Sequence, residues 1–267
     1  MAVPMPGTQR RKPYLRDGKN ELLVYCWAGC NSLAVLKELR QLGLLDDRCI
    51  TEPPRRTVRQ VVDEKPPHPD WWRKPWQAAR PIAGTLAEVY LRNRGLEFDD
   101  PEGRVLRFHP QRARENPDGE FERHPALLAA LRNVRVGEQV GIINVYLQKD
   151  GHDRIRDKKG KTVTGRAKDA VVMLSAFDEP TMGLVLCEGA ETGIALFQQE
   201  MRPIWACGGA GTLAKFPLLG GVETLTIAAD TGLAGQQAAE TLAQRWREAD
   251  REVFIIVPPV DDWAHPR

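Results

Sequence analysis

The chain has 267 residues, of which 42% are hydrophobic and 28% charged, and its formal net charge is +2. This length predicts one or two domains, each large enough for a core of its own. Every apolar run falls short of the roughly 20 residues of a membrane span, and Met1–Lys12 lacks the apolar core of a signal peptide. We therefore expect a cytoplasmic protein without a membrane partner. The odd number of five cysteines argues against a secreted disulfide framework.

The charges are divided unevenly along the chain. Residues 1–176 carry 32 Lys and Arg against 23 Asp and Glu, whereas residues 177–267 carry 6 against 13. The resulting net charges of +9 and −7 suit the first part to bind polyanions and the second to hold cations. This division is typical of a protein that binds nucleic acid or nucleotides while a metal acts on phosphates.

Residues 1–50 are predicted to contain a strand and a helix beside half of a zinc site. Cys26 and Cys30 stand in CxxxC spacing, and Ser32 would cap a helix that runs to Gln41. A structural zinc ion needs four ligands, and no other Cys or His stands at a recognisable ligand spacing. The predicted zinc site is therefore incomplete.

Residues 51–80 are predicted to be a linker, because proline removes backbone donors and the segment has little apolar periodicity. Its end carries Trp71, Trp72 and Trp76. These aromatic side chains either stack on bases or dock the linker on the core. We expect docking, since each ring offers a large apolar area.

Residues 81–170 are predicted to form a small basic α+β domain. A capping box at Thr85–Glu88 begins a helix that Gly95 ends. Arg92 and Arg94 lie in its last turn, where they either complement the helix dipole or bind phosphate. Downstream we expect a strand at residues 105–108, a helix at residues 126–134 and a strand at residues 141–147.

The segment 154–168 is the most basic of the chain, with seven Lys and Arg against the single acid Asp157. Such a run is often only a solvated loop, but its place before an acidic domain favours phosphate contact. Gly160 and Gly165 are expected to keep its backbone loose. The residues predicted here to bind nucleic acid or nucleotides are Arg154, Arg156, Lys158, Lys159, Lys161 and Lys168.

Residues 171–267 show repeated βα units, which predict a parallel sheet. Glu188 and Asp230 each follow an apolar run of strand length. Because the carboxyl ends of parallel strands share one crevice, we expect both acids in one cleft, where they would hold a divalent metal. The alternative is that each acid caps the next helix. Strands are expected at residues 184–187, 204–207, 225–229 and 252–257, and helices at residues 192–199, 212–216 and 235–248.

These motifs resemble a known family. Glu188-Gly189 after a strand, Asp230 after another and Ala234-Gly235 opening a helix resemble the Toprim domain shared by bacterial-type primases and topoisomerases. Residues 80–85, 90–95, 107–110 and 124–127 resemble the Toprim-containing primases of phages, plasmids and other mobile elements, and residues 25–30 resemble the second half of their zinc ribbon. The resemblance implies a Rossmann-like Toprim domain at residues 171–267, a basic α+β domain before it and a zinc-ribbon remnant at the N-terminus.

The resemblance also implies a chemistry. Toprim primases join nucleoside triphosphates into short RNA primers on single-stranded DNA with Mg²⁺ or Mn²⁺. By this resemblance Glu188 and Asp230 are catalytic and bind metal. The family has a second aspartate where this chain has Gly232, a loss that should weaken the metal site. Glu191, Asp261 or Asp262 would be the replacement, and Asp262 is included in the predicted metal site.

Two other functions stay open at this point. One is a catalytically weak or inactive relative that binds single-stranded nucleic acid or a replication partner, which the missing aspartate and the half zinc site favour. The other is a Toprim nuclease. The chain has no P-loop, so we expect DNA unwinding to come from a separate replicative helicase.

Overall fold

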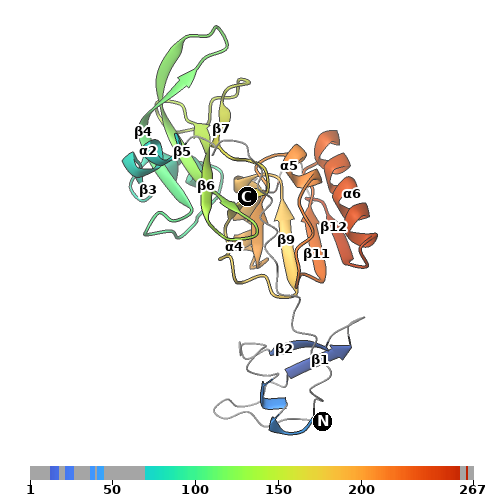
Figure 1. The fold of residues 1–267 in the computed structure, drawn as a ribbon. Coiled ribbons are helices and arrows are strands. Elements are labelled where there is room, and N and C mark those ends of the chain that lie inside the picture. Colours follow the sequence, from blue (N-terminus) through green and yellow to red (C-terminus); the bar gives the residue numbers. More distant parts are fainter. Residues whose placement is uncertain are drawn as a thin grey trace. The chain divides into compact units, whose positions relative to one another are not determined.

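The computed structural model describes residues 13–17, 22–26, 37–39, 41–44, 70–258 and 263. The chain divides into two compact units, Met1–Lys65 and Pro66–Arg267 (Figure 1). In the first unit, β1 (Pro13–Asp17) pairs antiparallel with β2 (Leu22–Cys26). Cys26 is the last residue of β2, whereas Cys30 lies outside the described residues. Zinc binding therefore stays a prediction.

Within residues 70–258, ten strands form one sheet in the order β12-β11-β9-β10-β8-β5-β4-β3, with β6 paired to β5 and β7 to β6. The strands are β3 (Arg80–Pro81), β4 (Leu106–Glu115), β5 (Phe121–Asn133), β6 (Gln139–Tyr146), β7 (Lys161–Gly165), β8 (Ala170–Met173), β9 (Gly183–Cys187), β10 (Ile204–Ala206), β11 (Thr224–Ala228) and β12 (Glu252–Ile256). The helices are α2 (Arg73–Ala78), α3 (Leu86–Asn93), α4 (Ala190–Gln198), α5 (Ala210–Ala214) and α6 (Leu233–Arg247).

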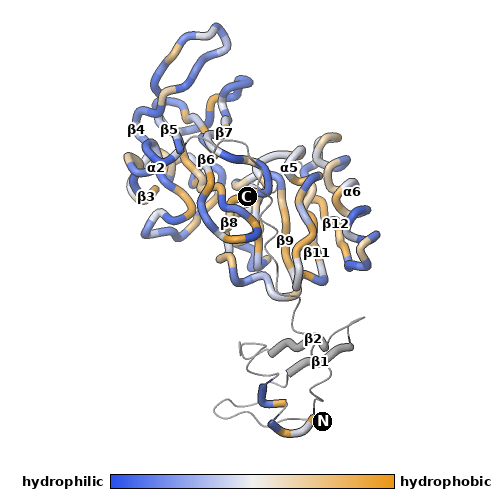
Figure 2. Tube along the Cα trace, viewed as in Figure 1, coloured by the Kyte–Doolittle hydropathy of each residue, from blue (hydrophilic) through white to orange (hydrophobic). Residues whose placement is uncertain are grey.

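The C-terminal part of the sheet is parallel, as the βα repeats predicted. Strand β9 pairs in parallel with β10 and β11, and β11 pairs in parallel with β12. Val185 and Cys187 of β9 belong to one apolar cluster, while Leu184 and Leu186 belong to another. Successive side chains of a strand point to opposite faces, so a sheet with both faces covered needs the continuous apolar runs seen in Figure 2. The predicted α/β fold is confirmed.

The helix predicted at residues 126–134 is wrong, because this segment belongs to β5. Its residues Ala126 to Leu131 are each at most 2% exposed, since β5 lies between β4 and β6. Ala and Leu favour helices in isolation, but a short apolar run also fits a strand that is buried on both faces. Tertiary burial decides between the two structures here.

The described end of the predicted linker is part of the folded core. Helix α2 begins at Arg73, and Trp72 and Trp76 are 6% and 8% exposed in a cluster with residues of β5 and β6. Docking is thus confirmed for these two side chains, whereas Trp71 is 75% exposed. Residues 51–69 lie outside the described part. The domain boundary between residues 170 and 171 stays a prediction.

Helix α3 begins at the predicted capping box. Thr85 Oγ1 accepts a hydrogen bond from the Ala87 amide at 3.2 Å, and Glu88 Oε2 accepts one from the Gly84 amide at 2.7 Å. Gly95 follows the helix with a φ of 69°, a left-handed conformation that glycine adopts easily. Among the described residues, none of the helices has the length and hydrophobicity needed to cross a membrane.

Candidate functional site

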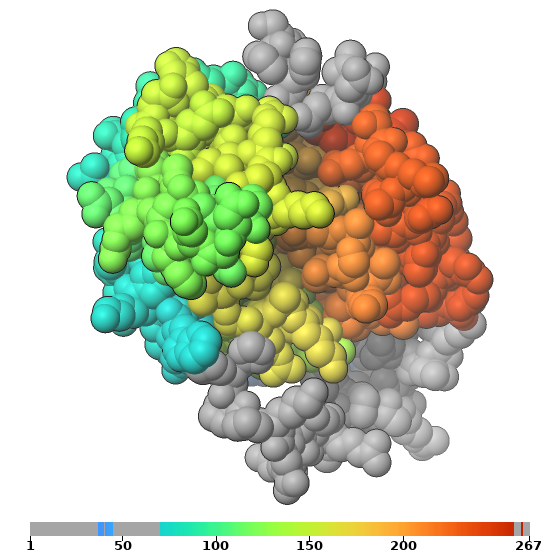
Figure 3. Space-filling model, turned by 90° about the horizontal axis from the view of Figure 1, so that it is seen from above, coloured from blue at the N-terminus to red at the C-terminus, as the bar shows by residue number. Residues whose placement is uncertain are grey.

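The two predicted acids meet at the carboxyl edge of the parallel strands. Glu188 follows β9 directly and Asp230 stands two residues after β11, and these strands are neighbours with Cys187 opposite Ala228. Both acids line one cleft of about 580 Å³. Figure 3 shows a hollow in the surface between the yellow-green residues of the basic part and the orange residues of the C-terminal part. The structure therefore brings Glu188 and Asp230 together.

Helix α6 starts close against both acids because Gly235 has no side chain. A Cβ atom at Gly235 would lie 3.3 Å from Asp230 Cβ and 3.4 Å from Glu188 Oε2. From the other side, Thr192 Oγ1 donates a hydrogen bond to Asp230 Oδ1 at 3.4 Å. Helices α4 and α6 thus fix the position of the acids from two directions.

The acids do not occupy the N-cap positions of these helices. The N-cap residues of α4 and α6 are Gly189 and Gly232. The alternative in which Glu188 and Asp230 cap these helices stays a prediction. Both glycines line the cleft, so two helix N-termini present amide groups and the positive ends of their dipoles to it.

A third carboxylate in the cleft belongs to Glu191, in the first turn of α4. Its Oε1 accepts a hydrogen bond from the hydroxyl of Tyr90 at 3.1 Å. Tyr90 is fully buried, and this burial, together with the negative charge of Glu191, raises the pKa of the phenol far above its usual value. The hydroxyl therefore stays protonated as a donor, and Glu191 is held in place from α3.

The acids of the cleft suit the way proteins bind Mg²⁺, with few protein ligands, rather than a metal site in which the protein supplies every ligand. Within residues 70–258 and the other described positions, no three His, Cys, Asp or Glu residues gather closely enough to hold a metal. Mg²⁺, however, is usually bound by one or two carboxylates together with waters and substrate phosphates. Glu188 and Asp230 fit this mode. Asp262 lies outside the described residues, so its predicted metal role stays untested.

Four of the predicted cations line the same cleft as these acids. Arg94 comes from the end of α3, whereas Arg154, Arg156 and Lys161 come from the basic segment. The other predicted cations lie elsewhere: Arg92 pairs with Glu88 at 2.8 Å, Lys159 pairs with Glu115 at 3.1 Å, Lys168 lines a second cavity, and Lys158 is exposed. The structure thus brings together only some of the cations that were predicted to bind nucleic acid or nucleotides.

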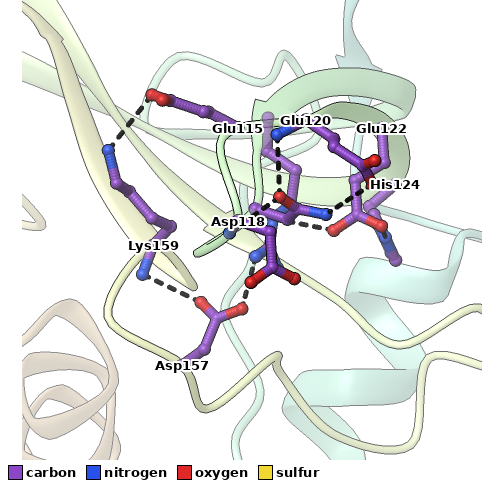
Figure 4. A network of polar contacts seen from close by, with 9 residues as sticks. Glu115, Asp118, Glu120, Glu122, His124, Asp157 and Lys159 are labelled. Atoms are coloured by element: carbon purple, nitrogen blue, oxygen red, sulfur yellow. Dashed lines mark hydrogen bonds and ion pairs between the residues drawn. The ribbon is translucent and has the colours of Figure 1, made fainter.

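The basic segment is not the loose loop that its glycines suggested. A Cβ atom at Gly160 would lie 1.9 Å from the carbonyl oxygen of Ile155, so this glycine permits a close backbone approach. Gly165 ends β7, which pairs with β6. Asp157 accepts a hydrogen bond from Arg114. It accepts another from the Lys159 amide (Figure 4). Sequence analysis missed Arg114, because nothing in its local pattern distinguishes it from the other arginines of β4.

Comparison with known proteins identifies the domain that carries the acids. Residues 183–265 match the family model of the Toprim domain. This chain contains a Toprim domain. Residues 67–174 of the chain match a domain of unknown function, DUF7146. No curated protein matches the sequence of this chain significantly.

Solved structures similar to this chain include several primase domains. A DNA primase domain from Pseudomonas aeruginosa superposes with a TM-score of 0.52 at 17% identity, over 74% of this chain and 73% of that chain. The primase fragment of the bacteriophage T7 primase-helicase protein gives a TM-score of 0.43 at 18% identity, over 66% and 63%. A DnaG primase catalytic domain bound to single-stranded DNA gives 0.46 at 17% identity, over 71% and 70%. The Pseudomonas match shows that this chain has a primase-like fold.

Proposed function

We propose that this protein is a DNA primase that synthesises short RNA primers on single-stranded DNA by metal-dependent nucleotidyl transfer. One observation carries this proposal: Glu188 and Asp230 line the same cleft as four cationic side chains. Carboxylates suit a hard divalent cation, and Arg and Lys suit phosphates. A site that joins nucleotides needs both.

Glu188 and Asp230 would hold Mg²⁺ or Mn²⁺ in this cleft. Such an ion, when bound, neutralises charge on the transferred phosphate and orients it for in-line displacement. Glu191 adds a third negative charge to the cleft, in a domain where Gly232 replaces the second aspartate of the family pattern. Glu188 would lie nearest to the reacting phosphate, as metal ligand or proton acceptor.

The cationic side of the cleft would bind the substrates. Arg94, Arg154, Arg156 and Lys161 would bind the phosphates of a nucleoside triphosphate or of the template, aided by the N-termini of α4 and α6. The 3′-hydroxyl of one nucleotide then gives up its proton to Glu188 or to solvent, and its oxygen forms a bond to the α-phosphorus of the next nucleotide. The bond from that phosphorus to the β-phosphate oxygen breaks, and pyrophosphate leaves. A separate replicative helicase is the partner we propose for strand opening.

The proposal is tested by incubating the full chain with single-stranded DNA, labelled nucleoside triphosphates and Mg²⁺ or Mn²⁺. We expect short labelled primers from the wild type and none from Glu188→Ala. Glu240→Ala is the matched control, because Glu240 is an exposed acid of α6 outside the cleft. Degradation of the DNA instead of synthesis would indicate the nuclease alternative.

A second function is favoured by one feature of the site. Gly232 leaves the cleft without the second aspartate, and the described residues contain no group of three metal-binding side chains. A protein with this site would bind single-stranded nucleic acid or a replication partner without joining nucleotides. Binding of single-stranded DNA without primer synthesis under either metal would establish this function.

A further inference from the structure

Arg114 of β4 is a buried cation that the proposed chemistry does not use. Its side chain is only 1% exposed. Nη2 donates a hydrogen bond to Asp157 Oδ2, and Nε lies 3.3 Å from Glu122 Oε1. Neither Nε nor Nη1 has a hydrogen-bond partner among the described residues. A buried guanidinium is costly unless it is paired, so the hydrogen bond to Asp157 offsets part of the cost of burying Arg114.

Asp157 connects this buried charge to the middle of the basic segment. Its Oδ1 accepts a hydrogen bond from the Lys159 amide at 2.8 Å, and its carbonyl oxygen accepts one from the Gly160 amide at 3.0 Å. The hydrogen bond from Arg114 is also the main cause that lowers the pKa of Asp157. Figure 4 shows Lys159 reaching from Asp157 to Glu115 at the edge of this network. Asp157 therefore stabilises the turn at residues 157–160, and its carboxylate connects this turn to Arg114 of β4.

The cations of the basic segment that line the cleft lie on either side of Asp157 in the sequence. Arg154 and Arg156 precede Asp157, and Lys161 follows it. On the first side, Asp153 accepts a hydrogen bond from Arg156 Nε at 2.8 Å. Asp153 and Asp157 are thus both paired with arginines.

We propose that Arg114 is a positioning residue. Its buried ion pair with Asp157 holds residues 153–161 so that Arg154, Arg156 and Lys161 face the cleft before a polyanion arrives. This inference rests on the proposed function, because it assumes that the cleft binds phosphates. Cations held in advance lose less conformational entropy on binding, so the pair contributes to affinity without touching the ligand.

The test uses Asp157→Asn in the full chain. The Asp157 side chain is 29% exposed, and Glu122 stays beside the buried guanidinium, so we expect this variant to fold. If the segment then adopts its binding arrangement about one tenth of the time, the dissociation constants for a Mg²⁺-bound nucleoside triphosphate and for a short oligodeoxythymidylate rise about tenfold. Asp157→Glu keeps the carboxylate and should restore most of the affinity.

Glu115→Gln is the matched control. It removes the ion pair between Glu115 and Lys159 on the same segment, but both side chains are nearly half exposed, at 46% and 45%. Exposed pairs contribute little, so the dissociation constants should change by less than about twofold. Trypsin provides a readout that does not depend on the ligand: cleavage after Arg156, Lys158 and Lys159 should be faster in Asp157→Asn than in Glu115→Gln.

The outcomes separate the inference from the proposed function. Weaker binding and faster cleavage in Asp157→Asn, with an unchanged unfolding temperature, support the inference. Wild-type affinity and wild-type cleavage in Asp157→Asn overturn it while the proposed function stands. A lowered unfolding temperature with no difference in cleavage between the two variants also overturns it, since Arg114 would then only stabilise the sheet. If the wild type binds neither probe, the proposed function fails and the inference fails with it.

Discussion

At the scale of single residues, Gly232 stands where the resemblance to Toprim primases implies a second aspartate. Its φ of −65° and ψ of 144° belong to an extended conformation that any residue adopts. A Cβ atom at this position would meet nothing within 4 Å. The backbone therefore does not require glycine at position 232. An aspartate would fit there without strain.

Gly232→Asp should accordingly strengthen the binding of divalent cations. A carboxylate two residues after Asp230 adds negative charge beside Glu188, so we expect the dissociation constant for Mn²⁺ to fall roughly tenfold in a spectroscopic titration. Aspartate is also a good N-cap, so stability should not decrease. Gly220→Asp is the control, because Gly220 has equal space but lies outside the cleft. Equal Mn²⁺ affinity in both variants would contradict the role assigned to position 232.

Glu188→Ala should abolish primer synthesis while the fold stays intact. The carbonyl oxygen of Glu188 accepts a hydrogen bond from the Gly208 amide at 2.7 Å, and alanine keeps this bond. The free energy of unfolding should therefore change by no more than about 1 kcal/mol. Denaturant unfolding followed by circular dichroism measures this change. If the Glu188→Ala variant is already unfolded without denaturant, Glu188 is a structural residue.

At the scale of elements, the basic segment combines residues with different surroundings. Lys161 lines the cleft, whereas Lys159 is paired with Glu115. For single-stranded DNA, each lost phosphate contact lowers the log–log slope of affinity against salt by roughly 0.7. We expect Lys161→Ala to show this change and Lys159→Ala to keep the wild-type slope. An unchanged slope for Lys161→Ala would mean that Lys161 makes no phosphate contact.

The ion pair of Asp157 should make the segment sensitive to acid. Arg114 lowers the pKa of Asp157 below 3.8, so the folded state binds this proton less readily than the unfolded state does. The contribution to stability is complete above the ordinary pKa and is lost as the pH falls through the lower folded value. Hydrogen exchange of the Lys159 and Gly160 amides should therefore lose protection below about pH 4 relative to the chemical rate. Asp157→Asn should lack this dependence.

What the sequence predicts differs between elements for a physical reason. The βα repeats of residues 184–257 were predictable because strand and helix periods alternate there. Strand β5 was not, because a buried run of Ala and Leu fits helix and strand alike. The meeting of Glu188 and Asp230 follows from topology, but the choice of cations in the cleft depends on Arg114, which lies 43 residues before its partner Asp157. Local patterns carry no information on such a contact.

At the scale of the whole molecule, β8 joins the two parts of the Pro66–Arg267 unit. It pairs with β5 on one side and with β10 on the other, so the sheet continues from β3 to β12. We expect β5 and β9 to lose hydrogen-exchange protection at the same denaturant concentration, because one sheet and its cores unfold cooperatively. Loss of protection in two separate steps would contradict this and would support the domain boundary predicted between residues 170 and 171.

The hydrogen bond from Tyr90 to Glu191 has a consequence for how relatives of this protein diverge. It joins residues 101 positions apart, one on α3 and the other in the first turn of α4. A lineage that replaced the phenol by an apolar ring would leave the carboxylate without its donor, and one that lost the acid would leave a buried hydroxyl to be satisfied. Selection therefore acts on the pair rather than on either residue, and the two positions should change together.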